Sequence, residues 1–193
     1  MPLPRFAVID LETSGFSTRR HRILQVGLVT VEPDGRIVDE WSSLVRLRWP
    51  LQRVGPTDVH HISRSTLRGA PRLVDVLDEL GSRIDGSVVT AHNAGFDAGF
   101  LARATRNRPA DDALRTSIER PLCTLLMSRR LDPDRLESHR LGDVAARYDV
   151  PLDRPHDALA DAAATAAVLP HLLAAHHIEH ADELEPFYVS PSL

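Results

Sequence analysis

Cysteine, lysine and long apolar runs are scarce or absent in this chain of 193 residues, and their scarcity limits the classes of protein to which it can belong. It has one cysteine, Cys123, so no internal disulfide can form, which suits a reducing cytoplasm. No segment approaches the ~20 consecutive apolar residues that cross a bilayer, so we expect no membrane partner. The N-terminus lacks the basic region and apolar run of a signal peptide. Lysine is absent, and this carries little weight because it can follow from genomic base composition.

Charge is distributed unevenly along the chain. The formal net charge is −4, so the overall charge gives no sign of nucleic-acid binding. The first 70 residues nevertheless carry ten arginines against seven acids. The run of Arg19, Arg20, His21 and Arg22 has two interpretations, a solvated loop or a rim that contacts phosphates, and charge alone favours the loop.

The length of the chain fits one domain, and an apolar fraction of 42% is enough for a substantial core. The order of the predicted elements indicates an α/β fold, a mixed sheet flanked by helices. The tail from Glu179 fits either disorder or packing on the domain. The predicted strands are 6–12, 23–31, 36–45 and 87–91, and the second and third of them form an antiparallel hairpin. The predicted helices are 71–84, 96–106, 141–148 and 158–175. Residues 122–126 fit either a strand or the start of a helix.

The segment FAVIDLETSGF, residues 6–16, ends a predicted buried strand with two acids. Asp10 and Glu12 are two residues apart, so their side chains point to the same face of the strand. Two carboxylates that close repel each other unless one is protonated or a cation neutralises them. Mg²⁺ and Mn²⁺ prefer such hard oxygen ligands. Taken alone, the pair fits a solvated strand end equally well.

The segment AHNAGFDAGFL, residues 91–101, places another acid at the end of an element. A short predicted strand ends in His92 and Asn93, and Asp97 follows in the first turn of a helix. The helix dipole favours an acid there in any case, and His92 and Asn93 fit ordinary turn and capping residues.

The segment HDALADA, residues 156–162, begins another helix. Asp157 fits a helix cap, whereas Asp161, five residues after His156, is harder to explain by helix propensity. This spacing alone is weak evidence of a site.

The three segments together predict a metal site. The carboxylates of Asp10, Glu12, Asp97 and Asp161 can hold two divalent cations, an arrangement suited to in-line displacement at phosphorus. A neutral histidine such as His156 can take the proton from the attacking water, because the ordinary pKa of histidine lies near ~6.5.

These motifs resemble the DnaQ-like 3′→5′ exonucleases with a DEDDh acidic set, a branch of the ribonuclease-H-like superfamily that includes the exonuclease domain of bacterial DNA polymerase III epsilon subunits. VIDLETSGF is similar to the first family motif, AHNAGFDAGFL to the second, and HDALADA to the third in the branch with histidine. HHISRSTLRGAP, residues 60–71, and SHRLGDVAARYDVPL, residues 138–152, resemble family segments between the motifs. The resemblance covers roughly residues 6–173.

The resemblance implies a ribonuclease-H-like mixed five-stranded sheet in one exonuclease domain, residues 1–175, followed by a tail, residues 176–193. It implies two Mg²⁺ or Mn²⁺ ions on Asp10, Glu12, Asp97 and Asp161, with His156 as general base. For Phe16 the alternative is a partly buried core aromatic, and for His61 a surface turn residue. The implied substrate contacts are Thr13, Ser14, Gly15, Phe16, His61 and Asn93.

Two positions depart from the family pattern. Gln25 stands where many relatives have an acid, and Cys123 with Thr124 stands where many have Asp-Thr. Neither position belongs to the implied metal set.

The implied function is a metal-dependent 3′→5′ exonuclease that releases nucleoside 5′-monophosphates from the 3′ end of DNA, in proofreading or repair. One alternative is an exoribonuclease or oligoribonuclease of the same family. A non-enzymatic alternative is a module that binds a polymerase or nucleic acid, and the presence of all five motif residues counts against it. The expected partners are single-stranded DNA or RNA 3′ ends, with a DNA polymerase subunit as a further candidate.

Overall fold

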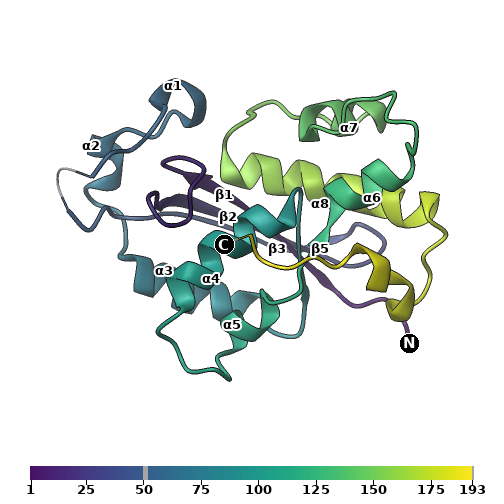
Figure 1. Cartoon of the computed structure of the whole chain (residues 1–193), viewed down its shortest axis with the longest axis horizontal. Helices are drawn as coiled ribbons and strands as arrows, with labels where there is room; N and C mark the ends of the chain where they lie inside the picture. The colour runs from purple at the N-terminus through teal and green to yellow at the C-terminus, as the bar shows by residue number, and fades with distance from the viewer. Residues whose placement is uncertain (50–51, 193) are drawn as a thin grey trace.

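The computed structural model describes residues 1–49 and 52–192 of the chain, and five strands form one mixed sheet (Figure 1). The strands lie in the order β3-β2-β1-β4-β5. The first three pair antiparallel, while β4 and β5 run parallel to β1. The predicted mixed five-stranded sheet is thereby confirmed. The strands are β1 (Phe6–Thr13), β2 (Ile23–Val31), β3 (Ile37–Leu44), β4 (Val88–Ala91) and β5 (Leu122–Cys123).

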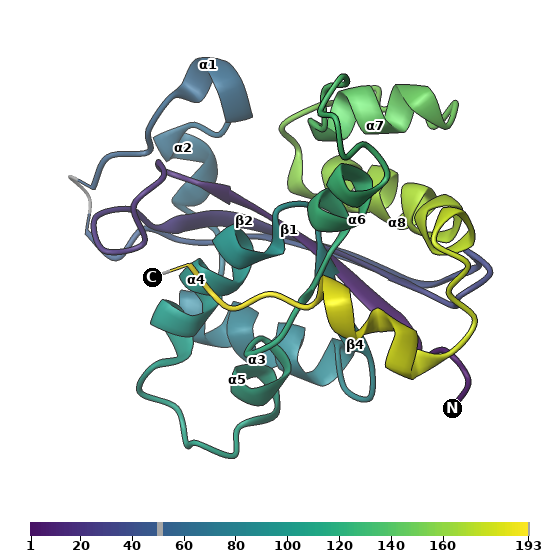
Figure 2. The ribbon, with the colours of Figure 1, turned by 45° about the vertical axis from the view of Figure 1, so that its right-hand side comes forward.

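Helices cover both faces of the sheet (Figures 1 and 2). Side chains of α3, α4 and α5 share one buried cluster with the sheet, and side chains of α6, α7 and α8 share the other. The helices are α1 (Thr57–His60), α2 (Arg64–Leu67), α3 (Leu73–Arg83), α4 (Ala94–Thr105), α5 (Ala113–Ser117), α6 (Thr124–Arg130), α7 (Leu141–Arg147), α8 (Ala158–Ala175) and the 3₁₀ helix η1 (Ala181–Phe187).

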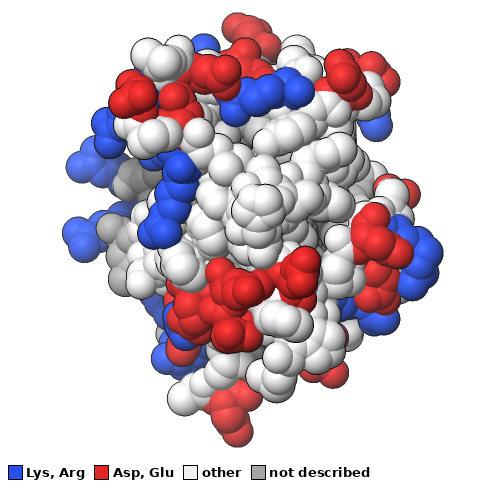
Figure 3. Space-filling model, turned by 90° about the vertical axis from the view of Figure 1, so that its right-hand side faces the viewer, with Lys and Arg blue, Asp and Glu red and all other residues white. Residues whose placement is uncertain are grey.

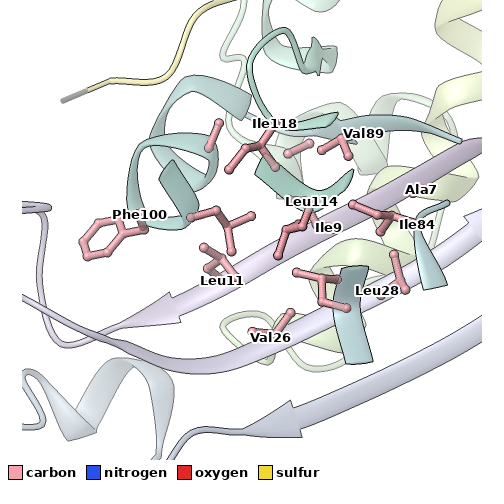
Figure 4. Close-up of a cluster of buried hydrophobic side chains, with 14 of the residues drawn as sticks. Ala7, Ile9, Leu11, Val26, Leu28, Ile84, Val89, Phe100, Leu114 and Ile118 are labelled. Atoms are coloured by element: carbon pink, nitrogen blue, oxygen red, sulfur yellow. The ribbon is translucent and has the colours of Figure 1, made fainter. Parts of the chain in front are cut away.

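Strand β1 sends alternate side chains to the two faces. Ile9 and Leu11 lie in the cluster with α3, α4 and α5 (Figure 4), whereas Phe6 and Val8 lie in the cluster with α8. Because side chains alternate along a strand, Asp10 and Glu12 continue the row of Phe6 and Val8 on the α8 face.

Helix α8 is the main cover of that face. Its Ala162, Ala166 and Leu169 are buried in the cluster that includes Phe6 and Val8 of β1. By length and composition, α8 is also the one helix in the described part of the chain that is apolar enough to cross a membrane. Half of it is buried within the fold, so its composition is that of a core helix.

The structure differs from the sequence prediction in its short helices. Three helices of four or five residues, α1, α2 and α5, were not predicted, because so few residues show no apolar repeat. Residues 122–126 contain both predicted possibilities, since β5 ends at Cys123 and α6 begins at Thr124. Part of the loop predicted before α1, Pro50 and Leu51, lies outside the described residues.

The C-terminal segment packs on the domain, which excludes the disordered alternative for residues 181–192. Leu184 and Phe187 of η1 are buried in the α8-side cluster. Tyr188 pairs with Leu122 of β5, and the backbone N–H of Ser192 donates to the carbonyl oxygen of Gly95 in α4 at 2.7 Å.

Candidate active site

The first two acids lie at the end of β1, beside the start of β2. Asp10 pairs with Gly27 of β2, and Glu12 pairs with Gln25. Leu11 between them is buried in the core, which fixes the strand's orientation. Both carboxyl groups therefore point to the face that α8 covers.

The third motif lies at the N-terminus of α8. Asp157 caps the helix, accepting from the backbone N–H of Ala160 at 3.1 Å, as the sequence suggested. Asp161 lies in the first turn, and its Oδ2 accepts from the backbone N–H of His156 at 3.1 Å. His156 is exposed, with φ +67°. The carboxylate of Asp161 thus holds the loop that presents the His156 ring.

Helix α8 can come this close to the sheet because β2 has a glycine there. A Cβ on Gly27 would overlap the backbone carbonyl of Ala158, in the first turn of α8. Gln25 bridges the same elements: its Nε2 donates to Oδ2 of Asp157, and its Oε1 accepts from the backbone N–H of Ala158, both at 3.5 Å. The N-terminus of α8 is therefore seated directly on β2.

The remaining acid comes from the other side of the sheet. Asn93 has φ +68° and turns the chain from β4 into α4. Asp97 follows in the first turn of α4 and is only 3% exposed. Burial raises the pKa of Asp97, and hydrogen bonds from the backbone of Asp97 itself and of Leu11 in β1 oppose this effect in part, so Asp97 lies next to β1.

His92 precedes this turn, and both nitrogens of its ring lie within hydrogen-bonding distance of other residues. One ring nitrogen of His92 is 3.0 Å from Oγ1 of Thr124, and the other is 2.9 Å from the carbonyl oxygen of His139. Burial lowers the pKa of His92, which favours the neutral ring in this position.

The acids act on one another's pKa values. Burial, and then the charges of Asp97, Asp161 and Glu12, raise the pKa of Asp10 well above its ordinary value. Burial together with the charges of Asp161 and Asp157 raises the pKa of Glu12 to about 8. Burial also raises the pKa of Asp97 to about 8 and raises that of Asp161. With pKa values of about 8, Glu12 and Asp97 keep their protons at neutral pH unless a cation replaces those protons.

The donor atoms fit a hard divalent cation. Glu12, His156 and Asp161 each offer one ligand atom, and these atoms lie within 4.8 Å of one another. The buried Oδ1 of Asp161 has no hydrogen-bond partner among the described residues. A buried carboxylate oxygen without a partner is costly, and a bound Mg²⁺ or Mn²⁺ would satisfy it.

The predicted substrate contacts are of two kinds: hydroxyl groups that bond within the loop after β1, and side chains that are exposed. Ser14 is buried; its Oγ accepts from the backbone N–H of Arg22 at 3.1 Å and lies 3.3 Å from Nδ1 of His21. Thr13 Oγ1 donates to the carbonyl oxygen of Gly15 at 2.9 Å. Both hydroxyl groups are thus engaged in shaping the loop.

The other predicted contacts are free to meet a ligand. Phe16 is 90% exposed and lies edge-on to Phe96, with ring centroids 6.4 Å apart. His61 is exposed at the end of α1 and lines a cavity of about 550 Å³ together with His156. Asn93 is exposed beside the buried Asp97.

Sequence reasoning missed parts of this site. Asp157 caps α8 and also raises the pKa of Asp10, Glu12 and Asp161 by its charge, so a fifth carboxylate belongs to the cluster. Its place in the HDALADA segment, directly after His156, was the available signal. Phe96 and Gln25 had no comparable signal because their roles depend on packing between elements.

Comparisons with known proteins agree with this geometry. A model of the exonuclease family RNase_T matches residues 7–169. DNA polymerase III of the PolC type from Lacticaseibacillus paracasei is 31% identical over 165 residues, and that from Bacillus subtilis is 30% identical over 182 residues. These matches cover 85% and 93% of this chain but only 11% and 12% of the relatives. The chain therefore spans about a tenth of their length.

Solved structures share the fold at low sequence identity. The 3′-exonuclease that recognises the 3′ end of a histone mRNA stem-loop aligns with a TM-score of 0.75 at 14% identity, over 100% of this chain and 92% of that one. Escherichia coli exonuclease I in complex with a dT13 oligonucleotide aligns with a TM-score of 0.72 at 16% identity, over 91% of this chain and 42% of that one.

The family match covers most of the chain, and the carboxyl groups of its three motifs meet at one end of the sheet. We conclude that the chain belongs to the RNase_T exonuclease family.

Proposed function

We propose that the chain is a metal-dependent 3′→5′ exonuclease that releases nucleoside 5′-monophosphates from the 3′ end of DNA. The observation that carries this proposal is the meeting of carboxyl groups from β1, α4 and α8, with His156 at the mouth of the cluster. This arrangement supports hydrolysis of a phosphodiester, because such a cluster suits cations that neutralise charge at phosphorus.

Asp10, Glu12, Asp97 and Asp161 would hold two Mg²⁺ or Mn²⁺ ions in this proposal. When bound, these cations supply Lewis acidity at the scissile phosphate. The raised pKa values of the acids support the assignment, since burial and then mutual repulsion disfavour the charged carboxylates, and bound cations would offset both effects.

His156 is proposed as the general base that accepts the proton of the attacking water. Its exposed ring fits this role, because one ring nitrogen lies near Glu12 and Asp161 and water can reach it. The backbone hydrogen bond to Asp161 keeps this ring beside the carboxylates.

The terminal nucleotide is proposed to lie against residues 13–16. Phe16 supports this placement because an exposed aromatic ring offers a stacking surface to a base. His61 and Asn93 complete the proposed contact surface from α1 and from the start of α4, while Thr13, Ser14 and Gly15 shape the loop.

DNA is proposed over RNA because the PolC-type relatives are DNA polymerases by name. Association with a DNA polymerase follows from the same relatives and is part of this proposal. An exoribonuclease is the second candidate, favoured by the structural relative that recognises the 3′ end of a histone mRNA stem-loop. A cytoplasmic location is supported by the single buried cysteine, Cys123.

The proposal is tested with a 3′-labelled single-stranded DNA oligonucleotide in Mg²⁺ or Mn²⁺, beside an RNA of the same sequence. The variants Asp10→Asn and Asp161→Asn should lose at least about 10³-fold in rate, because each removes a charged ligand. The variant Asp134→Asn, at an exposed acid of the α6–α7 loop, serves as a matched control and should digest normally. Normal digestion by Asp161→Asn would reject the assignment.

A further inference from the structure

A basic surface lies beside the site, on the segment between β3 and α3. We define it as the basic lobe, residues 46–49 and 52–68, which includes α1 and α2. The lobe has one acid, Asp58, although the chain as a whole is acidic. In the described part of the chain its arginines make no salt bridge. These arginines, all exposed, are Arg46, Arg48, Arg53, Arg64 and Arg68.

The opposite end of the molecule has a different charge pattern. Figure 3 shows the face that carries the N-terminus and η1, where groups of Asp and Glu side chains stand out and the arginines lie mostly near the edges. The basic lobe lies at the other end, beside the tip of β1 (Figures 1 and 2). A polyanion would therefore be attracted to the end of the molecule where the active site opens.

The lobe is in contact with the site itself. A Cβ on Gly55 would overlap the backbone of Ser14, in the loop after β1. His60 and His61 at the end of α1 line the same cavity as His156 and Asp157 at the start of α8. The lobe is thus one wall of the active-site cleft, and its arginines continue the surface away from the carboxylates.

The lobe is a folded surface. Nδ1 of the buried His60 accepts from the backbone N–H of Ile62 at 3.0 Å, so Nε2 carries the proton and donates to the carbonyl oxygen of Val54 at 2.9 Å. Arg64 donates to the carbonyl oxygen of Gln52 at 2.8 Å. These bonds fix the backbone from which the arginines project.

An exposed aromatic ring accompanies the arginines. Trp49 is 60% exposed, and the guanidinium group of Arg48 lies 5.4 Å from the centre of its ring. Basic side chains interleaved with exposed aromatic rings are the combination that binds single-stranded nucleic acid, through phosphates and base stacking.

We propose that the basic lobe binds the single-stranded DNA upstream of the nucleotide being released, with its arginines on the phosphates and Trp49 against a base. This inference rests on the proposed exonuclease function and adds a second binding surface to it. It also explains how a chain of net charge −4 holds a polyanion, because attraction is confined to one end.

The test compares a long substrate with one that has no upstream nucleotides. The variant combines Arg48→Ala, Arg53→Ala and Arg68→Ala; Arg64 is left intact because it bonds the backbone. For a 20-nucleotide single strand, KM should rise at least about tenfold and the slope of log KM against log salt should fall by about 2, at ~0.7 per phosphate contact. Hydrolysis of the p-nitrophenyl ester of thymidine 5′-monophosphate should be unchanged.

The matched control removes the same number of arginines from the far end of the sheet. Arg36 follows the β2–β3 turn, Arg106 follows α4, and Arg120 precedes β5; their triple alanine variant should keep the KM of the parent. A rise in KM equal to that of the lobe variant would reject the proposal in favour of a general charge effect. An unchanged KM in the lobe variant would also reject the proposal that the basic lobe binds DNA. In that case, hydrolysis of the ester by the parent protein would still support the exonuclease function.

A fluorescence measurement tests Trp49 separately. Trp41 is the other tryptophan and is half-buried beneath Arg83, so Trp41→Phe leaves Trp49 as the reporter. In a protein that also carries Asp161→Asn, the 20-nucleotide strand should quench this emission, and thymidine 5′-monophosphate should not. Emission unaffected by the long strand would exclude stacking on Trp49.

Discussion

At the residue scale, His156 differs from the neighbouring acids in its exposure and in its backbone conformation. Its ring is exposed, and its backbone N–H is the group that Asp161 binds. Its φ of +67° lies in the left-handed region, which few residues other than glycine and asparagine adopt without strain. The backbone and the ring of this residue can therefore be tested separately.

We expect His156→Asn to lose activity while the cluster still binds metal. Asparagine tolerates the left-handed conformation and keeps the backbone hydrogen bond to Asp161, whereas the imidazole that would accept a proton is gone. The rate should fall by about 10²- to 10⁴-fold. Single-turnover digestion measures the rate, and calorimetric titration with Mn²⁺ measures the affinity. Loss of Mn²⁺ binding would show that the ring serves as a ligand.

The residues of the site differ in how far sequence could reveal them. Asp10 and Glu12 were found because strand alternation fixes their common face, and Asp161 because it interrupts an alanine-rich helix. Asp157 was interpreted only as a cap, since its second effect depends on how α8 sits against β2. Phe96 meets Phe16 across two elements, and no local pattern carries that information.

At the element scale, the N-terminus of α8 depends on a close approach to β2. Gly27 faces the backbone of Ala158, one turn before Asp161. A side chain at this position would push α8 away from the sheet, and the cluster would open with it.

We expect Gly27→Ala to reduce both stability and activity. The overlap with the backbone of Ala158 cannot be relieved by a rotamer change, so α8 must shift, at a cost of about 1–3 kcal/mol. Gly142→Ala in α7 is the matched control: a Cβ there meets nothing within 4 Å, and alanine favours a helix by up to about 1 kcal/mol. Urea unfolding and oligonucleotide digestion report the two effects. A Gly27→Ala protein with unchanged activity and an unchanged free energy of unfolding would contradict the inferred close contact between α8 and β2.

We expect Leu184→Ala to destabilise the whole domain. Leu184 of η1 is fully buried against the α8-side cluster, and removing such a side chain costs about 2–5 kcal/mol. The neighbouring exposed acid offers a control, since Glu185→Ala should change the unfolding free energy by less than about 1 kcal/mol. A small effect of Leu184→Ala would mean that the segment after α8 contributes little to the fold.

The elements themselves were predictable where they are long. The Ala- and Leu-rich composition of residues 158–175 predicted α8 with its bounds, and the hairpin of β2 and β3 followed from its turn signal at Pro33-Asp34-Gly35. α1 and α2 were not found because they are too short to show an apolar repeat, and because Ile62 between them and Leu67 of α2 are buried against Leu24 of the distant strand β2. The packing of η1 depends on partners throughout the chain, so the tail alone could not reveal it.

At the scale of the whole molecule, the acidic cluster couples stability to pH. The pKa values of Glu12 and Asp97 are about 8 in the folded protein, above the ordinary values near 4 of the unfolded chain. Between these values the folded state binds more protons than the unfolded state. Its free energy of unfolding therefore falls as pH rises, until the folded groups have also lost their protons.

We expect the chelated protein to be less stable at pH 8.5 than at pH 5.5, with Asp97 contributing on the order of 3 kcal/mol to the difference. Urea unfolding in the presence of a chelator measures it. Asp97→Asn should flatten the dependence, because it removes a titrating group from the core. Mn²⁺ should reverse the trend, since it binds the deprotonated acids. Stability that rises with pH in the chelated protein would contradict the proposed cluster.

The two walls of the active-site cleft belong to different parts of the molecule. Helix α8 is embedded in the main core, whereas α1 and α2 rest on a separate cluster of three residues. Breaking the second set of contacts takes less free energy, so backbone amides of residues 57–67 should exchange with deuterium well before those of α8. The arginine-bearing wall of the cleft should therefore loosen before the wall that carries Asp161.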